Sequence, residues 1–368
     1  MRLVAFSDWH VCHSWPLITL DDIEAVHVRL VAYVQEHRPD LVLFLGDRFR
    51  AREPKDRVRA VADVGLRQLA AAQAAHGGII GLLVGNHDRY SESVGAGNTY
   101  SAMRVWGDVM PNAWLMERPG TYIPRPDVAI HALPASFPYV AEQYAPLPEA
   151  FNIFVFHGLI AGATYDRAGN VPIKHGVKMA DLDNPAWDLV LGGDVHVGQR
   201  FNLHHTTGGY VGSTLRLTEG DGHQPRGWLD VVLQKGAAPA FTFVDGGGPR
   251  FTQLAGGVDL TGWDGRAYTN EIVVMTLRGT ASELRAVEDV DVKDWFAARG
   301  ARAVLVRRQA ASETLSLVDG IAATSTPFDD MAAYIGSTDR KGLDPDRLLA
   351  KAAEILHGAS LARKGLFA

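Results

Sequence analysis

The stretch LVLGGDVHVGQR, from Leu189 to Arg200, shows a pattern that recurs through the first half of the chain. A run of apolar residues predicts a buried strand, and two glycines and the pair Asp194 and His196 follow it directly. Four earlier apolar runs end in the same residue types. Their polar residues are Asp8 and His10, Asp47, Asn86 with His87 and Asp88, and His157. Because the ends of parallel strands meet at one edge of a sheet, we expect these side chains to form a single site.

These residue types predict a pair of divalent metal ions. On extended backbone, residues two positions apart face the same side, so Asp8 with His10 and Asp194 with His196 would form chelating pairs. Carboxylates, imidazoles and an amide oxygen suit manganese, magnesium, iron or zinc better than copper(I) or an iron–sulfur cluster. The candidate ligands exceed what one ion binds in ordinary geometry, which predicts two ions that share a carboxylate. The candidates are Asp8, His10, Asp47, Asn86, His157, Asp194 and His196.

The segments between the strands predict a mixed α/β fold. Apolar residues recur at helical spacing from Asp21 to His37 and from Asp56 to His76, and Asp21 and Asp22 stand where capping residues belong. Strands that are apolar throughout and alternate with helices are typical of a layered sheet whose faces are both covered. From Gly208 to Val244 the runs are shorter and separated by turns, which predicts antiparallel strands.

The rest of the chain predicts a smaller unit and a helical end. GGGP, from Gly246 to Pro249, marks a boundary, after which a strand, a helix from Ser282 to Arg299 and a second strand follow. From Pro327 the pattern is helical again. We therefore predict one domain over residues 1–248, a small α/β domain over 249–312 and a C-terminal helical segment over 313–368.

Composition limits the classes of function. The chain has 368 residues, of which 47% are hydrophobic, so it can bury a sizeable core. A net charge of −6 argues against binding polyanions through bulk charge, although not against meeting phosphates through bound metal ions. The single cysteine, Cys12, rules out an internal disulfide. Because no apolar run approaches the ~20 residues of a membrane span, we expect a soluble, cytoplasmic protein.

The motifs DWH, GDRFR, GNHD, FHG and GDVH resemble those of calcineurin-like metallophosphoesterases, which read D-x-H, G-D-x-x-[RH], G-N-H-[DE], H and G-H-x-H in this order. The resemblance spans residues 1 to about 215 and implies a layered α-β-β-α sandwich that hydrolyses phosphoesters. By this resemblance, Asp8, His10 and His196 would hold one ion, and Asn86, His157 and Asp194 the other. Asp47 would bridge the two ions. His87 would be the catalytic imidazole, positioned by Asp88, and would stabilise phosphate charge or protonate the leaving oxygen.

Within this family the chain looks most like the SbcD-type DNA repair exonuclease subunit. GDVHVGQRF followed by YVGSTLRLTEGD resembles the segment after the last metal motif of that branch. Residues 249–312 resemble its capping domain, and TPFDDMAAYI resembles its C-terminal segment. The resemblance implies exonuclease or endonuclease activity in DNA repair and recombination. It also implies DNA and an SbcC-type ATPase as partners, and leaves a homodimer open.

Two positions depart from the family pattern. Asp194 stands where the family usually has histidine, and a further carboxylate makes the site harder. We therefore expect manganese, with magnesium or iron as alternatives, in preference to zinc. Arg50 stands where the nuclease branch often has histidine, and we assign it a catalytic role in clamping a phosphate oxygen.

Several alternatives stay open at this point. The protein is either the nuclease described above, a stand-alone phosphodiesterase or phosphatase for small phosphoesters, or a catalytically weak scaffold subunit. The basic run from Arg48 to Arg59 either guides a nucleic-acid backbone or is a solvated helix face. Trp9 and Tyr90 either stack on bases or pack at the rim, and His13, His204 and His205 are read as non-ligands. The last helix docks on the body of the protein or on an ATPase.

Overall fold

The computed structural model describes residues 1–12, 17–89, 101, 103–160, 177–310, 344, 347, 348 and 351. Its described residues group into two compact units. The second holds 256–259, 277–288 and the described residues from 308 onward, and the first holds the remainder of 1–307. The predicted domain boundaries at 248 and 312 stay predictions. The predicted C-terminal helical segment lies almost entirely outside the described residues, as do His13 and Tyr90.

The first sheet has six strands in the order β12-β11-β1-β2-β3-β4. Its strands are β1 (Arg2–Phe6), β2 (Leu41–Phe44), β3 (Ile79–Leu83), β4 (Ala113–Met116), β11 (Gly227–Val232) and β12 (Ala240–Asp245). β1, β2, β3 and β4 run parallel to one another, whereas β11 pairs antiparallel with both β1 and β12. The three strands that end in candidate ligands near the N-terminus are therefore neighbours in one sheet.

The second sheet also has six strands, in the order β5-β6-β7-β8-β10-β9. Its strands are β5 (Gly120–Arg125), β6 (Val128–Leu133), β7 (Phe151–His157), β8 (Leu189–Gly193), β9 (Gln199–Arg200) and β10 (Gly208–Tyr210). β6, β7, β8 and β10 are parallel, and β5 and β9 pair antiparallel at the two edges. The other two strands that carry candidate ligands, β7 and β8, are neighbours here.

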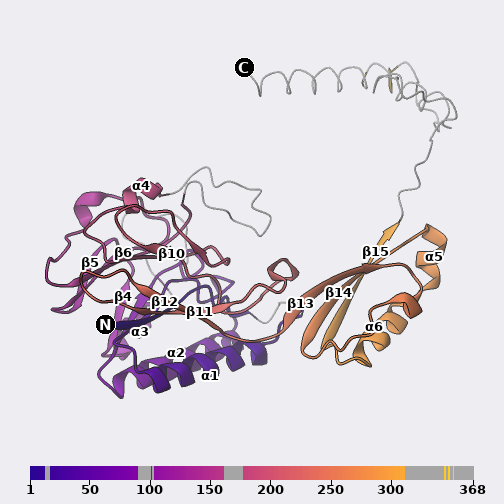
Figure 1. The fold of residues 1–368 in the computed structure, drawn as a ribbon, viewed down its shortest axis with the longest axis horizontal. Helices are drawn as coiled ribbons and strands as arrows, with labels where there is room; N and C mark the ends of the chain where they lie inside the picture. The colour runs from indigo at the N-terminus through magenta and orange to yellow at the C-terminus, as the bar shows by residue number, and fades with distance from the viewer. Residues whose placement is uncertain are drawn as a thin grey trace. The chain divides into compact units, whose positions relative to one another are not determined.

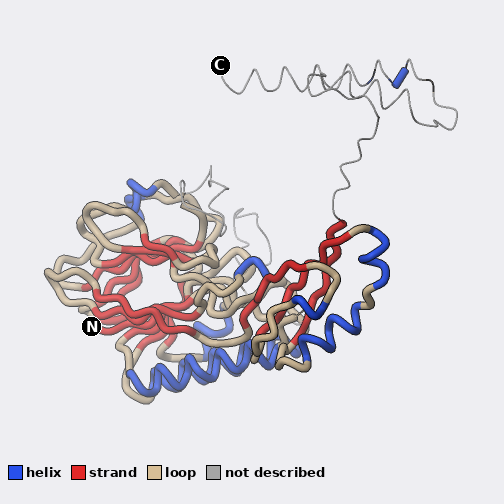
Figure 2. The backbone as a smooth tube through the Cα atoms, turned by 45° about the vertical axis from the view of Figure 1, so that its right-hand side comes forward, coloured by secondary structure: helices blue, strands red, loops and turns tan. Residues whose placement is uncertain are grey.

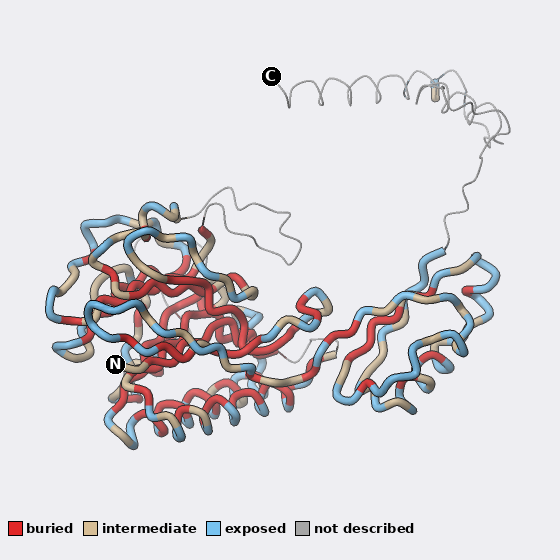
Figure 3. Tube along the Cα trace, in the orientation of Figure 1, coloured by how far each residue is buried: buried red, intermediate tan, exposed pale blue. Residues whose placement is uncertain are grey.

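Alternate residues of the inner strands enter different cores, which explains why β2, β3 and β1 from Leu3 onward are apolar throughout. In β1, Val4 and Phe6 pack with the helices α1 (Leu20–His37) and α2 (Asp56–Ala74), whereas Leu3 and Ala5 pack between the two sheets. The outer face of the second sheet packs with α4 (Met179–Leu182). Figure 1 shows α1 and α2 below the sheets, Figure 2 shows a helical layer along the same face of the strands, and Figure 3 shows burial concentrated in the strands. The predicted mixed α/β layered fold is confirmed.

The remaining elements include a third, smaller sheet. They are α3 (Arg104–Val109), the 3-10 helices η1 (Ala141–Gln143), η2 (Glu219–Asp221) and η3 (Leu260–Gly262), and a three-stranded sheet β13-β14-β15 with α5 and α6. Their bounds are β13 (Arg250–Gly256), β14 (Glu271–Gly279), α5 (Ala281–Ala286), α6 (Asp289–Ala297) and β15 (Ala303–Ala310). The single helix expected from Ser282 to Arg299 is thus two helices. None of the described helices is long and apolar enough to cross a membrane.

The N-terminus of α1 differs from the sequence-based expectation. Thr19, rather than Asp21 or Asp22, is the capping residue. Its hydroxyl accepts a hydrogen bond from the Asp22 backbone at 3.3 Å, and the Asp22 carboxylate accepts one from the Thr19 backbone at 2.9 Å. This reciprocal pair is a capping box, in which the acidic residue belongs at the third helical position. Asp22 therefore supports the cap from inside the helix.

Candidate metal centre

The candidate ligands come from the ends of five parallel strands, three in the first sheet and two in the second. The site therefore lies where the two sheets face each other, rather than at the edge of a single sheet. Three overlapping groups place their potential ligand atoms within 4.8 Å of one another. The groups are Asp8 with His10 and His196, His10 with Asp47 and His87, and Asp8 with Asp47 and His157.

The backbone at these positions is not extended, which corrects the expected origin of the chelating pairs. β1 ends at Phe6, and the φ angles of Asp8 and His10 are 53° and 44°. Asp47 and Asp194 also have positive φ angles, of 60° and 88°. Positive φ is uncommon outside glycine and marks positions that the surrounding structure holds in place. Tight turns after the strands, not alternation along them, bring the paired side chains together.

The first group of ligands joins the ends of β1 and β8. The Nε2 atoms of His10 and His196 are 3.0 Å apart, and Asp8 Oδ1 lies 3.6 Å from His10 Nε2. Asp8 Oδ1 is buried and has no hydrogen-bond partner. Two facing imidazole nitrogens and an unsatisfied carboxylate oxygen leave a need for positive charge at this point. A divalent cation fits that need, because each of these atoms is an ordinary metal ligand.

A further set of candidate ligands surrounds His157. Its Nε2 lies 3.0 Å from Asn86 Oδ1, 3.3 Å from Asp47 Oδ1 and 3.8 Å from Asp194 Oδ1. The other ring nitrogen, Nδ1, donates to the Leu45 carbonyl at 2.6 Å, which fixes the ring orientation and points Nε2 into the site. The Leu45 carbonyl is a functional group that sequence reasoning missed, because a backbone oxygen leaves no residue-type signal.

Asp47 connects the ligands around His10 with those around His157. Its Oδ1 lies 3.3 Å from His157, whereas its Oδ2 lies 3.6 Å from His10. One oxygen thus faces each group, which is the arrangement of a carboxylate that bridges two ions. All seven predicted ligands belong to this connected cluster. Their assignment to one ion or the other stays a prediction.

His87 lies beside this cluster and is more exposed than its neighbours. Its side chain is 37% exposed, and its Nε2 lies 3.9 Å from Asp47 Oδ2. Its Nδ1 donates to the Arg50 carbonyl at 2.6 Å. Arg50 therefore contributes a backbone oxygen that orients the imidazole. The proposed clamping of a phosphate by its guanidinium stays a prediction.

Asp88 hydrogen-bonds to the backbone of the turns after β2 and β3, and its expected role in positioning His87 stays a prediction. Its carboxylate accepts three hydrogen bonds at 2.9 Å, from the backbone N–H groups of Asp47, Arg48 and Gly85. The carboxylate is buried and ties the turn after β2 to the turn after β3. It therefore holds the two segments that carry Asp47 and His87 in a fixed relation.

Burial and charge shift the pKa values of the site in opposite directions. Burial raises the pKa of Asp8 to about 6 and lowers that of His10 to about 3. Burial also opposes charge on Asp47 and His157, yet their mutual attraction prevails. This attraction lowers the pKa of the Asp47 carboxyl and holds the pKa of His157 well above its usual value. Asp8, Asp47 and Asp194 thus gather negative charge in a buried place, where bound cations would offset it.

Several neighbouring residues have packing roles. Arg48 is 1% exposed, and its guanidinium lies over the rings of Phe49 and Trp106 at 4.6 and 5.2 Å, so it cannot begin a DNA-guiding surface. Burial lowers the pKa of Arg48 to about 9. Trp9 is 1% exposed and stacks on His27 at 3.9 Å, which rules out stacking on a base.

The first half of the chain matches a known protein family. The model of the family described as calcineurin-like phosphoesterase matches residues 1–198. No curated protein matches the chain. Among solved structures, a dimetal phosphatase from Danio rerio is 11% identical, with a TM-score of 0.40 over 64% of this chain and 93% of that chain. A predicted phosphoesterase from Streptococcus pneumoniae is 16% identical, with a TM-score of 0.26 over 62% and 81%. The phosphopantetheinyl hydrolase of Mycobacterium tuberculosis is 14% identical, with a TM-score of 0.30 over 58% and 89%.

Proposed function

The chain belongs to the calcineurin-like phosphoesterase family, and from this premise we propose that it is a metal-dependent nuclease that hydrolyses phosphodiester bonds of DNA. The observation that carries hydrolysis is Asp47, whose two oxygens face two adjoining groups of ligands beside an exposed imidazole. The preference for DNA rests on the SbcD-like segments of the sequence.

The residues of the site divide the work between binding and proton transfer. Asp8, His10 and His196 would hold one cation, Asn86, His157 and Asp194 the other, and Asp47 would bridge them. Divalent ions held by these residues would supply a nucleophilic water at neutral pH and would stabilise charge on the phosphoryl oxygens. Manganese remains our proposal for their identity. Because Asp8, His10 and His157 are buried, the cluster also excludes bulk water from one side of the reacting phosphate.

His87 is placed to move a proton. Its Nδ1–H is engaged by the Arg50 carbonyl, so Nε2 is the atom that faces the substrate. When protonated, Nε2 donates to the leaving oxygen and offsets the charge that develops there. Arg50, Lys55 and Arg57 are exposed on the segment that follows Asp47 in the chain. Their positive charge supports the proposal of a nucleic-acid backbone near the site, since phosphate contacts are made mainly by such side chains.

Two assays on the same preparation test this function. The substrates are end-labelled DNA with free 3′ ends and bis-p-nitrophenyl phosphate, each with manganese and each compared with the His87→Ala variant. We expect wild-type protein to cleave both substrates and the variant to cleave neither at a comparable rate. Cleavage of the small ester alone would contradict the nuclease assignment and support the stand-alone phosphodiesterase, which the net charge of −6 favours. Metal binding without cleavage of either substrate would support a scaffold subunit.

An SbcC-type ATPase is proposed as partner on the sequence resemblance alone. The C-terminal segment 313–368 is the part of the chain assigned to it. We expect co-expression with such an ATPase to give a complex that survives gel filtration, and deletion of 313–368 to abolish it. A complex that forms equally well without this segment would contradict the assignment.

A further inference from the structure

A groove opens between the outer strands of the two sheets, outside the metal centre. Its volume is about 540 Å³, which lies in the range of pockets that bind small organic groups. One wall is β9 with β10, and the other is β11 with β12 and the segment before β11. The lining residues that matter most are Val197, Arg200, Val211, Arg226, Phe241 and Phe243.

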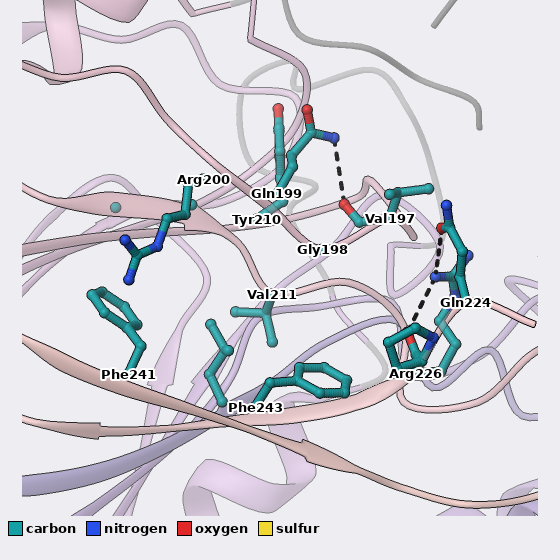
Figure 4. Close-up of a pocket in the computed structure, with 14 residues that line it drawn as sticks. Val197, Gly198, Gln199, Arg200, Tyr210, Val211, Gln224, Arg226, Phe241 and Phe243 are labelled. Carbon is teal, nitrogen blue, oxygen red and sulfur yellow. Dashed lines mark hydrogen bonds between the residues drawn. The ribbon is translucent and has the colours of Figure 1, made fainter. Parts of the chain in front are cut away.

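The chemistry of the walls favours a flat aromatic group. Phe241 and Phe243 are two positions apart on β12 and so face the same side, toward the groove. Phe243 is 40% exposed although it is a large apolar side chain. From the opposite wall, the Arg200 guanidinium lies over the Phe241 ring at 5.1 Å (Figure 4). Aromatic rings and a guanidinium plane are the surfaces on which nucleobases stack.

The far end of the groove offers polar groups to the edge of such a ring. Gln224 and Arg226 lie there, and Figure 4 shows the two side chains hydrogen-bonded at that end. Arg226 is 3% exposed and pairs with Asp221 at 2.6 Å, so its charge is largely offset. Its Nε is buried and has no hydrogen-bond partner. Because this buried Nε is closed to the groove, the half-buried Gln224 amide is the polar group at this end that can meet the edge of a ligand, such as a base carbonyl or ring nitrogen.

The groove adjoins the metal centre through two separate stretches of backbone. Val197, which lines it, follows the candidate ligand His196 directly. Val211, which also lines it, is two residues before Ser213, whose N–H donates to the His196 carbonyl at 3.1 Å. A group bound in the groove is therefore held beside the loop that carries His196.

We propose that this groove is a subsite for an unpaired nucleobase of the strand whose phosphate occupies the metal centre. The proposal rests on the proposed nuclease function and deepens it. The substrate end would be single-stranded at this position, because a base can enter only when it has left its pair. An aromatic side chain of a protein partner would meet the same rings, but it would leave the Gln224 amide without an edge contact.

Binding of a fluorescent base tests the subsite without any turnover. The probe is a short single-stranded oligonucleotide that contains one 2-aminopurine, whose emission falls when it stacks on an aromatic ring. Phe243→Leu removes the ring and keeps the bulk, and Phe243→Trp restores a ring. Trp114→Leu is the matched control, since Trp114 is 36% exposed on β4 at the opposite edge of the same sheet. We expect Phe243→Leu to weaken binding about tenfold and abolish the quenching, and Phe243→Trp and Trp114→Leu to leave both intact. Equal binding and quenching in Phe243→Leu and wild type would overturn the proposal.

Substrates that lack a base separate this proposal from the function on which it rests. Two oligonucleotides are compared, one normal and one with abasic sites, on wild type and on Phe243→Leu. We expect wild type to cleave the normal strand about tenfold more efficiently, and Phe243→Leu to cleave both at the lower rate. If both proteins prefer the normal strand equally, the subsite is refuted while the nuclease function stands. If wild type cleaves neither strand yet hydrolyses bis-p-nitrophenyl phosphate, the nuclease function itself fails.

Discussion

At the scale of single residues, the imidazoles of the site differ mainly in exposure. The side chains of His10 and His157 are 7% and 0% exposed, whereas that of His87 is 37% exposed. A buried imidazole is suited to holding an ion in a fixed geometry, and an exposed one can meet a substrate. This difference, which the sequence pattern does not contain, supports a role for His87 that is separate from the metal-binding role expected of His10 and His157.

Replacement of His87 by alanine tests that separation. We expect the His87→Ala variant to keep the metal content of wild type and to lose about 10²- to 10⁴-fold in kcat, the usual contribution of a general acid or base. Metal analysis and rates on bis-p-nitrophenyl phosphate measure the two effects. His204→Ala is the control, because His204 is exposed and its ring belongs to none of the ligand groups. A loss of metal in His87→Ala would assign the residue to the ligand set instead.

We expect the Asp194 carboxylate to favour hard metal ions in the site. Its carboxylate lies 3.8 Å from His157 Nε2, and its backbone N–H donates to Asp8 Oδ2 at 3.2 Å. Replacing this carboxylate by imidazole removes a negative charge and adds a softer ligand. We expect Asp194→His to shift the ratio of zinc to manganese affinity toward zinc by on the order of tenfold. Competitive titration measures the ratio, and Asp194→Asn, which keeps an oxygen, should shift it less. An unchanged ratio in Asp194→His would mean that residue 194 does not bind an ion.

His27 predicts a pH dependence of stability. It is fully buried, neither ring nitrogen has a hydrogen-bond partner, and burial lowers its pKa from 6.5 to about 3. Between these values the unfolded chain takes up a proton that the folded protein excludes, so stability falls as pH drops from 6.5 toward 3. We expect the free energy of unfolding to fall by about 2 kcal/mol more in wild type than in His27→Leu between pH 7 and pH 5. Denaturant titrations at both pH values measure this, and parallel losses would contradict it.

At the scale of elements, much of the site follows from where each strand ends. The sequence predicts the strands well because each carries apolar residues on both faces, one for each adjoining core. It cannot tell which sheet a strand joins, since β3 and β7 have the same texture but pair with different neighbours. It also places Asp8 and His10 together for the wrong reason, because the turn that joins them is defined by long-range contacts.

Gly46 is the clearest case of a turn position that only glycine can occupy. Its φ is +98°, and a Cβ there would lie 2.4 Å from His157 Nδ1. We expect Gly46→Ala to destabilise the protein by more than the roughly 1–2 kcal/mol of left-handed strain alone and to weaken metal binding. Gly77→Ala is the matched control, because Gly77 has φ +77° with open space around its Cβ position. Thermal unfolding with and without manganese measures both, and equal effects of the two changes would show that the clash is absent.

At the scale of the whole first unit, the two sheets explain why the ligands are so far apart in the chain. Parallel strands of both sheets end at the same place, so residues from 8 to 196 meet in one cluster. The ordered motifs made the residue types and their common location predictable. Burial of Arg48, the role of the Leu45 carbonyl and the contacts of Asp88 were not predictable, because each depends on how the two sheets pack.

The central claim is that this cluster holds two divalent cations bridged by Asp47. Metal content per chain tests it most directly, measured by elemental analysis after saturation with manganese and removal of loosely bound metal. The account predicts two tightly held ions in wild type and none in Asp47→Ala, because the bridging carboxylate serves both. Fewer than two ions in wild type, or retention of both in Asp47→Ala, would contradict it.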